Sequence, residues 1–253
     1  MTPLPPGFLR APFAHRGLHG AQTPENSRAA VRAAIHAGYG IELDLQPSRD
    51  GRAMVFHDYD LARLTGARGL ICQRAAADLG RLRLAGSEET IPTLPDILAL
   101  VAGRVPLLLE LKDQHGQMGA TDGTLEAATA AALAGYAGPV AVMSFNPAMM
   151  IAMAALAPDI PRGLVTCAFA DEDWPQLGAA RRAELRAMAD FDAAGASFVS
   201  HEHQDLATPR LAELRAADAA ILCWTVRSPG EEAVARRVAD TITFEGYLPE
   251  IPA

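Results

Sequence analysis

The stretch Gly40-Ile-Glu-Leu-Asp-Leu-Gln46 has the pattern of a buried β-strand that carries two carboxylates. Side chains alternate between the two faces of a strand, so Glu42 and Asp44 point to one side and the aliphatic residues point to the other. Charged residues are rare in a strand that is covered on both faces. The stretch therefore indicates a parallel strand of an α/β fold, with a functional site near its carboxyl end.

A second stretch, Leu107-Leu-Leu-Glu-Leu-Lys112, repeats this arrangement with charges of both signs. The same alternation places Glu110 and Lys112 on one face of the strand. Both charged pairs come near the carboxyl ends of their strands, which is where catalytic groups collect in a (β/α)8 barrel.

The rest of the chain alternates short β-like runs with Ala-rich segments of helical period, a pattern typical of βαβ units and a parallel sheet. With 253 residues, half of them hydrophobic, the chain has the usual size of one (β/α)8 barrel, and we predict a single domain over residues 1–253. A helix is expected at residues 27–37, with Asn26 as its N-cap and Gly38 as its C-cap. Other helices are expected at residues 125–133, 148–156, 176–189 and 209–217. Eight strands, the number that the barrel requires, are expected at residues 11–15, 40–45, 105–112, 139–145, 162–166, 196–201, 220–226 and 240–244.

Residues 58–92 interrupt this alternation, because they carry turn residues and only a short helical stretch at residues 75–79. We predict a small insertion over the active-site face, following a hairpin. Asp50-Gly51 is a strong signal for a two-residue hairpin turn. A turn centred on that pair would make residues whose numbers sum to 101 face each other, so His57 is expected opposite Asp44 with the two Cβ atoms roughly 5 Å apart.

The composition of the chain indicates which partners it binds and in which cellular compartment it works. The net charge of −8 opposes nonspecific attraction to nucleic acid and to anionic lipid, so an anionic substrate needs locally placed cations. Three widely spaced cysteines without a CxxC pair favour reduced thiols. Residues 1–10 lack the features of a signal peptide, and no apolar run reaches the length of a membrane span. We expect a cytoplasmic protein that acts on a small molecule, without nucleic acid and without stable membrane insertion.

The charged residues of the two strands predict a site for phosphoryl chemistry. Glu42, Asp44 and Glu110 offer oxygen ligands, which suit one hard divalent cation, Mg²⁺ or Ca²⁺. Such a cation, together with Arg16 and Lys112, would neutralise phosphoryl oxygens. A histidine, His15, precedes Arg16 at the end of the first predicted strand and is expected on the same rim.

Several motifs follow one another along nearly the whole chain: Ala14-His-Arg-Gly17, Pro24-Glu-Asn26, Gly40-Ile-Glu-Leu-Asp-Leu-Gln46, Ser48-Arg-Asp-Gly51, Val55-Phe-His-Asp58, Leu64-Thr-Gly66, Ile91-Pro-Thr-Leu94, Leu109-Glu-Leu-Lys112, Ser144-Phe-Asn-Pro147 and Trp224-Thr-Val226. Their combination in this order is far more specific than any one of them. With these motifs the sequence resembles the glycerophosphodiester phosphodiesterase family.

The resemblance implies a (β/α)8 barrel that hydrolyses glycerophosphodiesters to an alcohol and glycerol 3-phosphate. It implies one divalent cation, held by the residues that match the metal ligands of the family, Glu42, Asp44 and Glu110.

The same resemblance implies roles for four further residues. His15 and His57 match the general acid and base pair of the family. Arg16 and Lys112 match its phosphate contacts. We assign the general acid to His57, because the negative charge of Asp44 would favour a protonated imidazole there.

Two departures from the family pattern concern the choice of substrate. Arg227 stands where the family usually has Asn after Trp-Thr-Val, and Phe244 and Glu245 stand where an Asp is usual after the last strand. We expect Trp224 to form an apolar wall for the alcohol part of the substrate. We expect Arg227 to contact the substrate and to disfavour a cationic choline group.

Three alternatives stay open. The barrel could instead be a phospholipid-cleaving lyase, which cyclises its substrate, or a catalytically silent metal-binding regulatory protein. Glu25 and Asn26 could do no more than cap the first helix. We leave four other histidines as structural or surface residues: His36, His115, His201 and His203.

Overall fold

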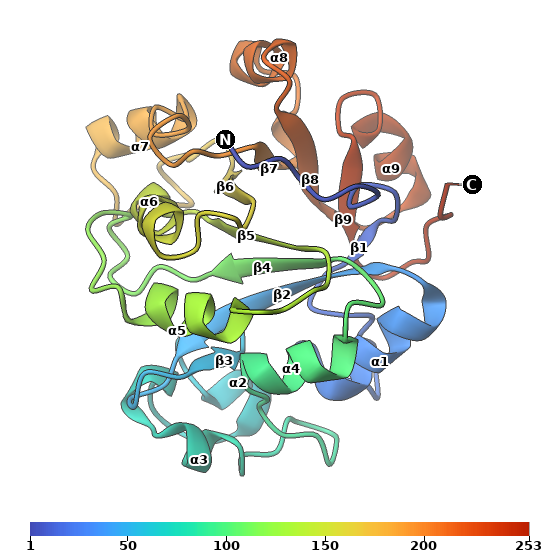
Figure 1. Cartoon of the computed structure of the whole chain (residues 1–253), viewed down its shortest axis with the longest axis vertical. Coiled ribbons are helices and arrows are strands. Elements are labelled where there is room, and N and C mark those ends of the chain that lie inside the picture. Colours follow the sequence, from blue (N-terminus) through green and yellow to red (C-terminus); the bar gives the residue numbers. More distant parts are fainter. Residues whose placement is uncertain (253) are drawn as a thin grey trace. The chain divides into compact units, whose positions relative to one another are not determined.

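The computed structural model describes residues 1–252, and the chain divides into two compact units. The N-terminal unit comprises Phe13–Lys112 and Gly123–Val140. The C-terminal unit comprises Met1–Pro12, Asp113–Asp122 and the residues from Ala141 onward. In both units parallel strands alternate with helices along the chain, and Figure 1 draws them from blue to red in this order.

Three parallel strands form the centre of the N-terminal unit. They are β1 (Phe13–Ala14), β2 (Gly40–Pro47) and β4 (Leu107–Leu111), and β2 lies between the other two. Every residue of the three strands is buried, which explains their aliphatic runs. The register of β2 on β4 pairs Asp44 with Glu110, so the acidic positions of the two strands are direct neighbours.

The observed register of the hairpin after β2 differs by one residue from the predicted register. β3 (Ala53–Val55) is antiparallel to β2 and pairs Gln46 with Met54, so the paired residue numbers sum to 100 instead of 101. The Ser48 N–H donates to the Arg52 carbonyl at 2.9 Å, and Gly51 is left-handed with a φ of 70°. The turn is therefore a three-residue loop with a left-handed glycine at its third position, the next most common hairpin connection.

Helices α1 (Arg28–Ala37) and α5 (Thr124–Leu133) pack against β2, and α4 (Leu94–Val101) packs against these two helices and β3 (Figure 1). The predicted C-cap Gly38 is confirmed, but the N-cap of α1 is Ser27, whose side chain accepts from the Ala30 N–H; Asn26 as N-cap was wrong. We did not predict α4, although Thr93 and Asp96 form a capping box at its start.

The segment after His57 holds three short helical turns: α2 (Ala62–Thr65), η1 (Ile71–Gln73) and α3 (Ala76–Leu79). They pack their aliphatic side chains around Met54 and Phe56 at the end of the hairpin, and so form an apolar cluster of their own. The predicted short helix is present as α3. The position of this segment over the active-site face stays a prediction.

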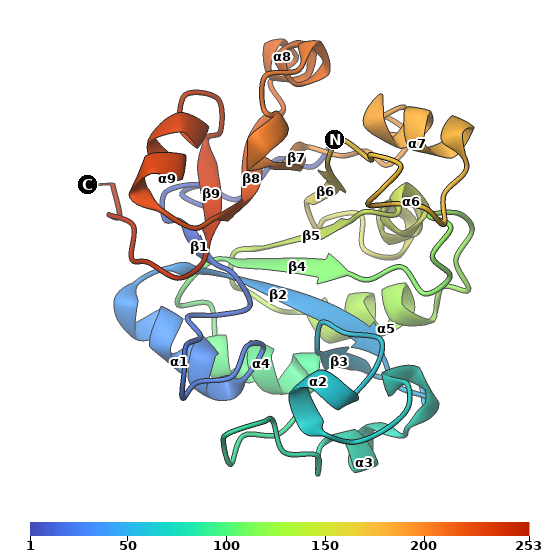
Figure 2. The same cartoon turned by 180° about the vertical axis from the view of Figure 1, so that it is seen from behind.

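The C-terminal unit contains neighbouring parallel strands from β5 to β9 in chain order, as the yellow to red part of Figure 2 shows. Each of the eight predicted strands is thus present across the two units, and α7 is shorter than predicted. None of the helices within residues 1–252 is long and apolar enough to cross a membrane. The strands are β5 (Val140–Ser144), β6 (Arg162–Thr166), β7 (Phe198–Glu202), β8 (Ala220–Val226) and β9 (Thr241–Phe244). The helices are α6 (Pro147–Leu156), α7 (Ala179–Arg186), η2 (His203–Asp205), α8 (Pro209–Ala216) and α9 (Pro229–Ala235).

A close approach between β6 and β7 gives a first testable prediction. A Cβ atom on Gly163 would lie 2.4 Å from the ring of Phe198, whose strand neighbours β6. Gly163→Ala should therefore lower the free energy of unfolding by about 1–3 kcal/mol, as overpacking of a core does. Gly20→Ala is the control, because nothing lies within 4 Å of its added Cβ. Urea unfolding measures both variants, and equal stabilities would show that the strands adjust freely.

Candidate active site

Three carboxylates lie together at the centre of the N-terminal unit. Glu42 and Asp44 come from β2 and Glu110 comes from β4, and they are only 2%, 1% and 7% exposed. One oxygen of each lies within 4.8 Å of the others. The alternation of side chains along the two strands and their register together bring the three acids to one point.

The ammonium group of Lys112 lies between two of these acids. Its Nζ is 2.8 Å from Asp44 Oδ1 and 2.7 Å from Glu110 Oε1. Burial alone raises the pKa of Asp44, but the positive charges of Lys112 and Arg16 hold that pKa well below its usual range. Asp44 is therefore a carboxylate that stays ionised in the buried site.

Glu42 has the opposite electrostatic environment. Burial raises its pKa well above the usual range, and the negative charges of Asp44 and Glu110 raise it further. Burial also raises the pKa of Glu110. The three acids together therefore carry more negative charge than Lys112 and Arg16 offset. Three clustered oxygen ligands with this excess of negative charge fit a hard divalent cation.

Two left-handed residues hold the acids in place. Asn26, with a φ of 56°, donates from Nδ2 to Asp44 Oδ2 at 2.8 Å and accepts from the Asp44 N–H at 3.2 Å. Arg16, with a φ of 55°, donates its backbone N–H to Glu42 Oε2 at 3.0 Å. Such backbone conformations are unfavourable for residues other than glycine and persist where the surroundings impose them. The sequence left Asn26 open between a functional role and helix capping, and its two contacts with Asp44 favour the functional role.

The side chain of Arg16 connects the acids to the loop before α1. Its Nε lies 3.3 Å from Asp44 Oδ2, and its Nη1 donates to Glu25 Oε1 at 2.7 Å. His15, which directly follows β1, is half-buried, and its charge acts on Asp44 as well. The first strand and its turn therefore bring two further predicted residues to the carboxylates.

His57 lies near Asp44 by a route that differs from the predicted one. In the shifted register Phe56, not His57, donates its backbone N–H to the Asp44 carbonyl. The His57 carbonyl accepts from Gln46 Nε2 at 2.9 Å, and its Nδ1 lies 2.8 Å from Asp58 Oδ1. Burial lowers the pKa of His57, and the negative charge of Asp44 opposes this only in part. The predicted attraction from Asp44 is therefore present, but burial outweighs it.

Seven of the nine predicted site residues thus converge in the N-terminal unit. All of them either belong to the carboxylate cluster or act electrostatically on Asp44: His15, Arg16, Glu42, Asp44, His57, Glu110 and Lys112.

The other two predicted residues, Trp224 and Arg227, belong to the C-terminal unit. Trp224 donates from Nε1 to the Ser200 carbonyl at 3.0 Å, and its ring packs on Phe145 at a centroid distance of 5.5 Å. Arg227 lies 3.5 Å from Glu245, so its guanidinium is partly neutralised. Their contacts with a substrate stay predictions.

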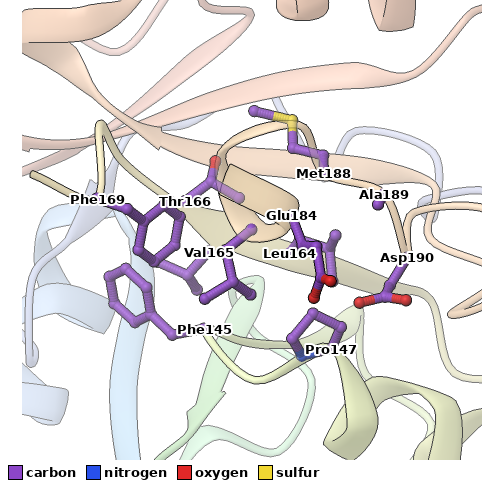
Figure 3. A pocket seen from close by; sticks show the side chains of 11 residues that line it. Phe145, Pro147, Leu164, Val165, Thr166, Phe169, Glu184, Met188, Ala189 and Asp190 are labelled. Atoms are coloured by element: carbon purple, nitrogen blue, oxygen red, sulfur yellow. The ribbon is translucent and has the colours of Figure 1, made fainter. Parts of the chain in front are cut away.

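A narrow crevice in the C-terminal unit lies between β6, α6 and α7 (Figure 3). Phe145 and Phe169 lie on one side of it, and the carboxylates of Glu184 and Asp190 lie on the other. None of the nine predicted site residues lines this crevice. Both acids pair with Arg181, at 3.0 Å from Glu184 and 3.4 Å from Asp190, so these charges offset one another.

Comparison with known proteins gives a match over almost the whole chain. Residues 15–243 match the family described as the glycerophosphoryl diester phosphodiesterase family. A glycerophosphodiester phosphodiesterase from Bacillus altitudinis is 40% identical over 107 residues, which are 40% of this chain and 43% of that relative. The aligned part therefore spans less than half of that relative.

Solved structures of relatives share the fold. A phosphodiesterase from Oleispira antarctica, in complex with the product sn-glycerol-3-phosphate, is 26% identical with a TM-score of 0.75, over 92% of this chain and 91% of that one. A glycerophosphodiester phosphodiesterase from Thermotoga maritima is 22% identical with a TM-score of 0.71, over 92% of each chain. The predicted (β/α)8 barrel fold is confirmed.

The charges of the site give a second prediction, for stability in excess chelator. Lys112→Met removes the partner of two buried carboxylates and should cost about 3–5 kcal/mol, as loss of one side of a buried ion pair does. Glu42→Gln should cost less, because Glu42 already lies among negative charges that favour its neutral form. Urea unfolding at neutral pH measures both. A larger loss for Glu42→Gln than for Lys112→Met would contradict this account of the site.

Proposed function

Because the chain belongs to the glycerophosphoryl diester phosphodiesterase family, we propose that it hydrolyses glycerophosphodiesters to an alcohol and glycerol 3-phosphate. The observation that carries this proposal is the buried cluster of Glu42, Asp44 and Glu110 beside Lys112 and two histidines. The solved Oleispira antarctica relative holds sn-glycerol-3-phosphate as its product, which supports the same product class here.

We propose that the three carboxylates hold one divalent cation, Mg²⁺ or Ca²⁺. When bound, such a cation supplies positive charge that stabilises the negative charge of phosphoryl oxygens in the transition state. Lys112 and Arg16 would add to this charge from the protein side, because both already lie beside Asp44. The acidic protein as a whole repels anions, so these local cations are what would attract a phosphodiester.

The proposed reaction needs two proton transfers, and the two histidines would provide them. His15 would take a proton from the attacking water as its oxygen bonds to phosphorus. His57 would give a proton to the alcohol oxygen as the bond between phosphorus and that oxygen breaks. Burial lowers the pKa of His57, so less of it is protonated at neutral pH than we expected, but the imidazolium that forms gives up its proton more readily. Asp58, 2.8 Å from Nδ1, would leave Nε2 of His57 to face the substrate.

We propose further that Trp224 packs against the leaving alcohol and that Arg227 affects the choice of alcohol. The 3.5 Å pair between Arg227 and Glu245 reduces the charge available to repel choline, so we expect a weaker preference than an unpaired arginine would give. We place the reaction in the cytoplasm on soluble diesters.

The proposed function predicts release of glycerol 3-phosphate that depends on a cation. An enzyme-coupled assay with several glycerophosphodiesters should show turnover with Mg²⁺ or Ca²⁺ and none in excess chelator. Calorimetry should show weaker cation binding for Glu110→Gln and unchanged binding for Glu88→Gln, whose side chain is 80% exposed. Full turnover of a metal-free protein would refute the cation. Production of a cyclic phosphate without glycerol 3-phosphate would identify a lyase, and no turnover at all would favour a silent barrel.

The division of work between the histidines predicts a dependence on the leaving group. His57→Ala should slow cleavage of glycerophosphoethanolamine by about 10²- to 10⁴-fold, the usual contribution of a general acid. The same variant should largely spare a nitrophenyl diester, because that leaving group departs as a stable anion. His15→Ala should slow both substrates alike, and His36→Ala, at an exposed position of α1, is the control. If the leaving-group dependence belonged to His15→Ala instead, the two roles would be exchanged.

A further inference from the structure

Arg63, on the short helix α2, binds two carboxylates at once. Its Nε and Nη2 donate to the two oxygens of Asp58 at 2.6 and 2.8 Å. Its Nη1 and Nη2 donate to the two oxygens of Glu25 at 2.9 and 2.8 Å. Each carboxylate is thus held by a pair of hydrogen bonds, an arrangement that fixes its plane and direction and that only the guanidinium fork of arginine provides.

Each of these carboxylates also contacts a residue of the proposed site. Asp58 Oδ1 lies 2.8 Å from His57 Nδ1. Glu25 Oε1 accepts from Arg16 Nη1 at 2.7 Å. Arg63 therefore reaches the proposed general acid through one carboxylate and the proposed phosphate contact through the other.

Positive and negative side chains alternate along this series of contacts. Glu25 lies between Arg16 and Arg63, and Asp58 lies between Arg63 and His57. Because Arg63 shares the negative charge of Glu25, less of that charge is left to offset Arg16. The positive charge of Arg16 is then more available to a phosphate than in a simple Arg16–Glu25 pair.

The exposure of the three side chains differs. The side chain of Arg63 is 49% exposed, whereas those of Glu25 and Asp58 are 12% and 21% exposed. A single ion pair with such an exposed partner contributes little to folding stability, but two bidentate pairs that share one arginine contribute more. The four hydrogen bonds of Arg63 therefore stabilise this part of the segment and also fix the orientation of the groups beyond them.

We propose that Arg63 is a positioning residue, which sets the orientation of His57 through Asp58 and of Arg16 through Glu25. The proposal rests on the proposed function for its effect on the reaction, while the contacts themselves do not depend on it. The segment after His57 then has a role in the reaction, because Arg63 of α2 connects the proposed proton donor, His57, to the proposed phosphate contact, Arg16.

The test compares three variants of the full chain. Arg63→Gln removes the charge and both forks, and Arg63→Lys keeps the charge but not the planar fork. Arg68→Gln is the matched control, because Arg68 is an exposed arginine of the same segment. Arg68→Gln should unfold thermally like the wild type, the unfolding of the two Arg63 variants measures what the forks add to stability, and Arg63→Lys replaces Arg63→Gln if the latter does not fold.

Steady-state kinetics give the first readout. Both Arg63 variants should lower kcat for glycerophosphoethanolamine by about 10- to 100-fold, as loss of an outer partner of a site residue does. They should lower kcat less for the nitrophenyl diester, and should raise KM for both substrates through Arg16. In an Asp58→Asn background, Arg63→Gln should add little to the leaving-group-dependent loss. Full rescue by Arg63→Lys, or unchanged kinetics in both variants, would overturn the proposal.

A second readout does not depend on activity. In proton NMR, the Nδ1–H of His57, identified by its loss in His57→Ala, should be protected from solvent exchange in the wild type and in Arg68→Gln. It should be lost in Arg63→Gln, since Asp58 is then no longer held. If the wild type hydrolyses no diester but the signal changes in this way, the proposed function fails and the positioning role stands. An unchanged signal in Arg63→Gln would overturn the positioning role whatever the activity.

Discussion

The rest of the site depends on one buried interaction, the contact of the Lys112 ammonium with Asp44 and Glu110. Two acids brought side by side by the β2–β4 register would repel each other strongly in a buried place. Lys112 makes their pairing possible, and it still leaves Glu42 in a surplus of negative charge. The contacts among Asp44, Glu110 and Lys112 therefore explain how the sheet holds buried charge at this point, and the surplus of negative charge around Glu42 is what supports the proposed cation.

The sequence was sufficient to predict this centre, because it depends on a simple periodicity. Alternation along two strands placed Glu42, Asp44, Glu110 and Lys112 correctly, and all eight strands were found from their aliphatic runs. Such strands are simple to predict from sequence, because each is buried over its whole length and therefore carries an aliphatic run. The hairpin register and the end of the first strand pointed to His57 and His15 near the acids, and the motifs that resemble the family added their acid and base roles.

What the sequence could not settle were choices between nearly equivalent local structures and contacts across long separations. Asp50-Gly51 fits a two-residue turn and a three-residue loop alike, and the choice moved the register by one residue. Asn26 and Ser27 are both good helix caps, and only the tertiary position of Asp44 assigns Asn26 to the site. The hydrogen bonds between Arg63 and Glu25 join residues 38 positions apart in the chain, and no local sequence pattern predicts such a contact.

The pair of left-handed residues Arg16 and Asn26 has a further consequence for engineering. The Asn26 N–H donates to the Arg16 carbonyl at 2.8 Å, so the loop between them is a ring closed by its own backbone. Inside this ring, Gly20 and Thr23 form a small bridge of their own. A change in the length of residues 20–23 should therefore cost the fold little, because the bond between Asn26 and Arg16 closes the loop at its base and loop length alone has a small entropic effect.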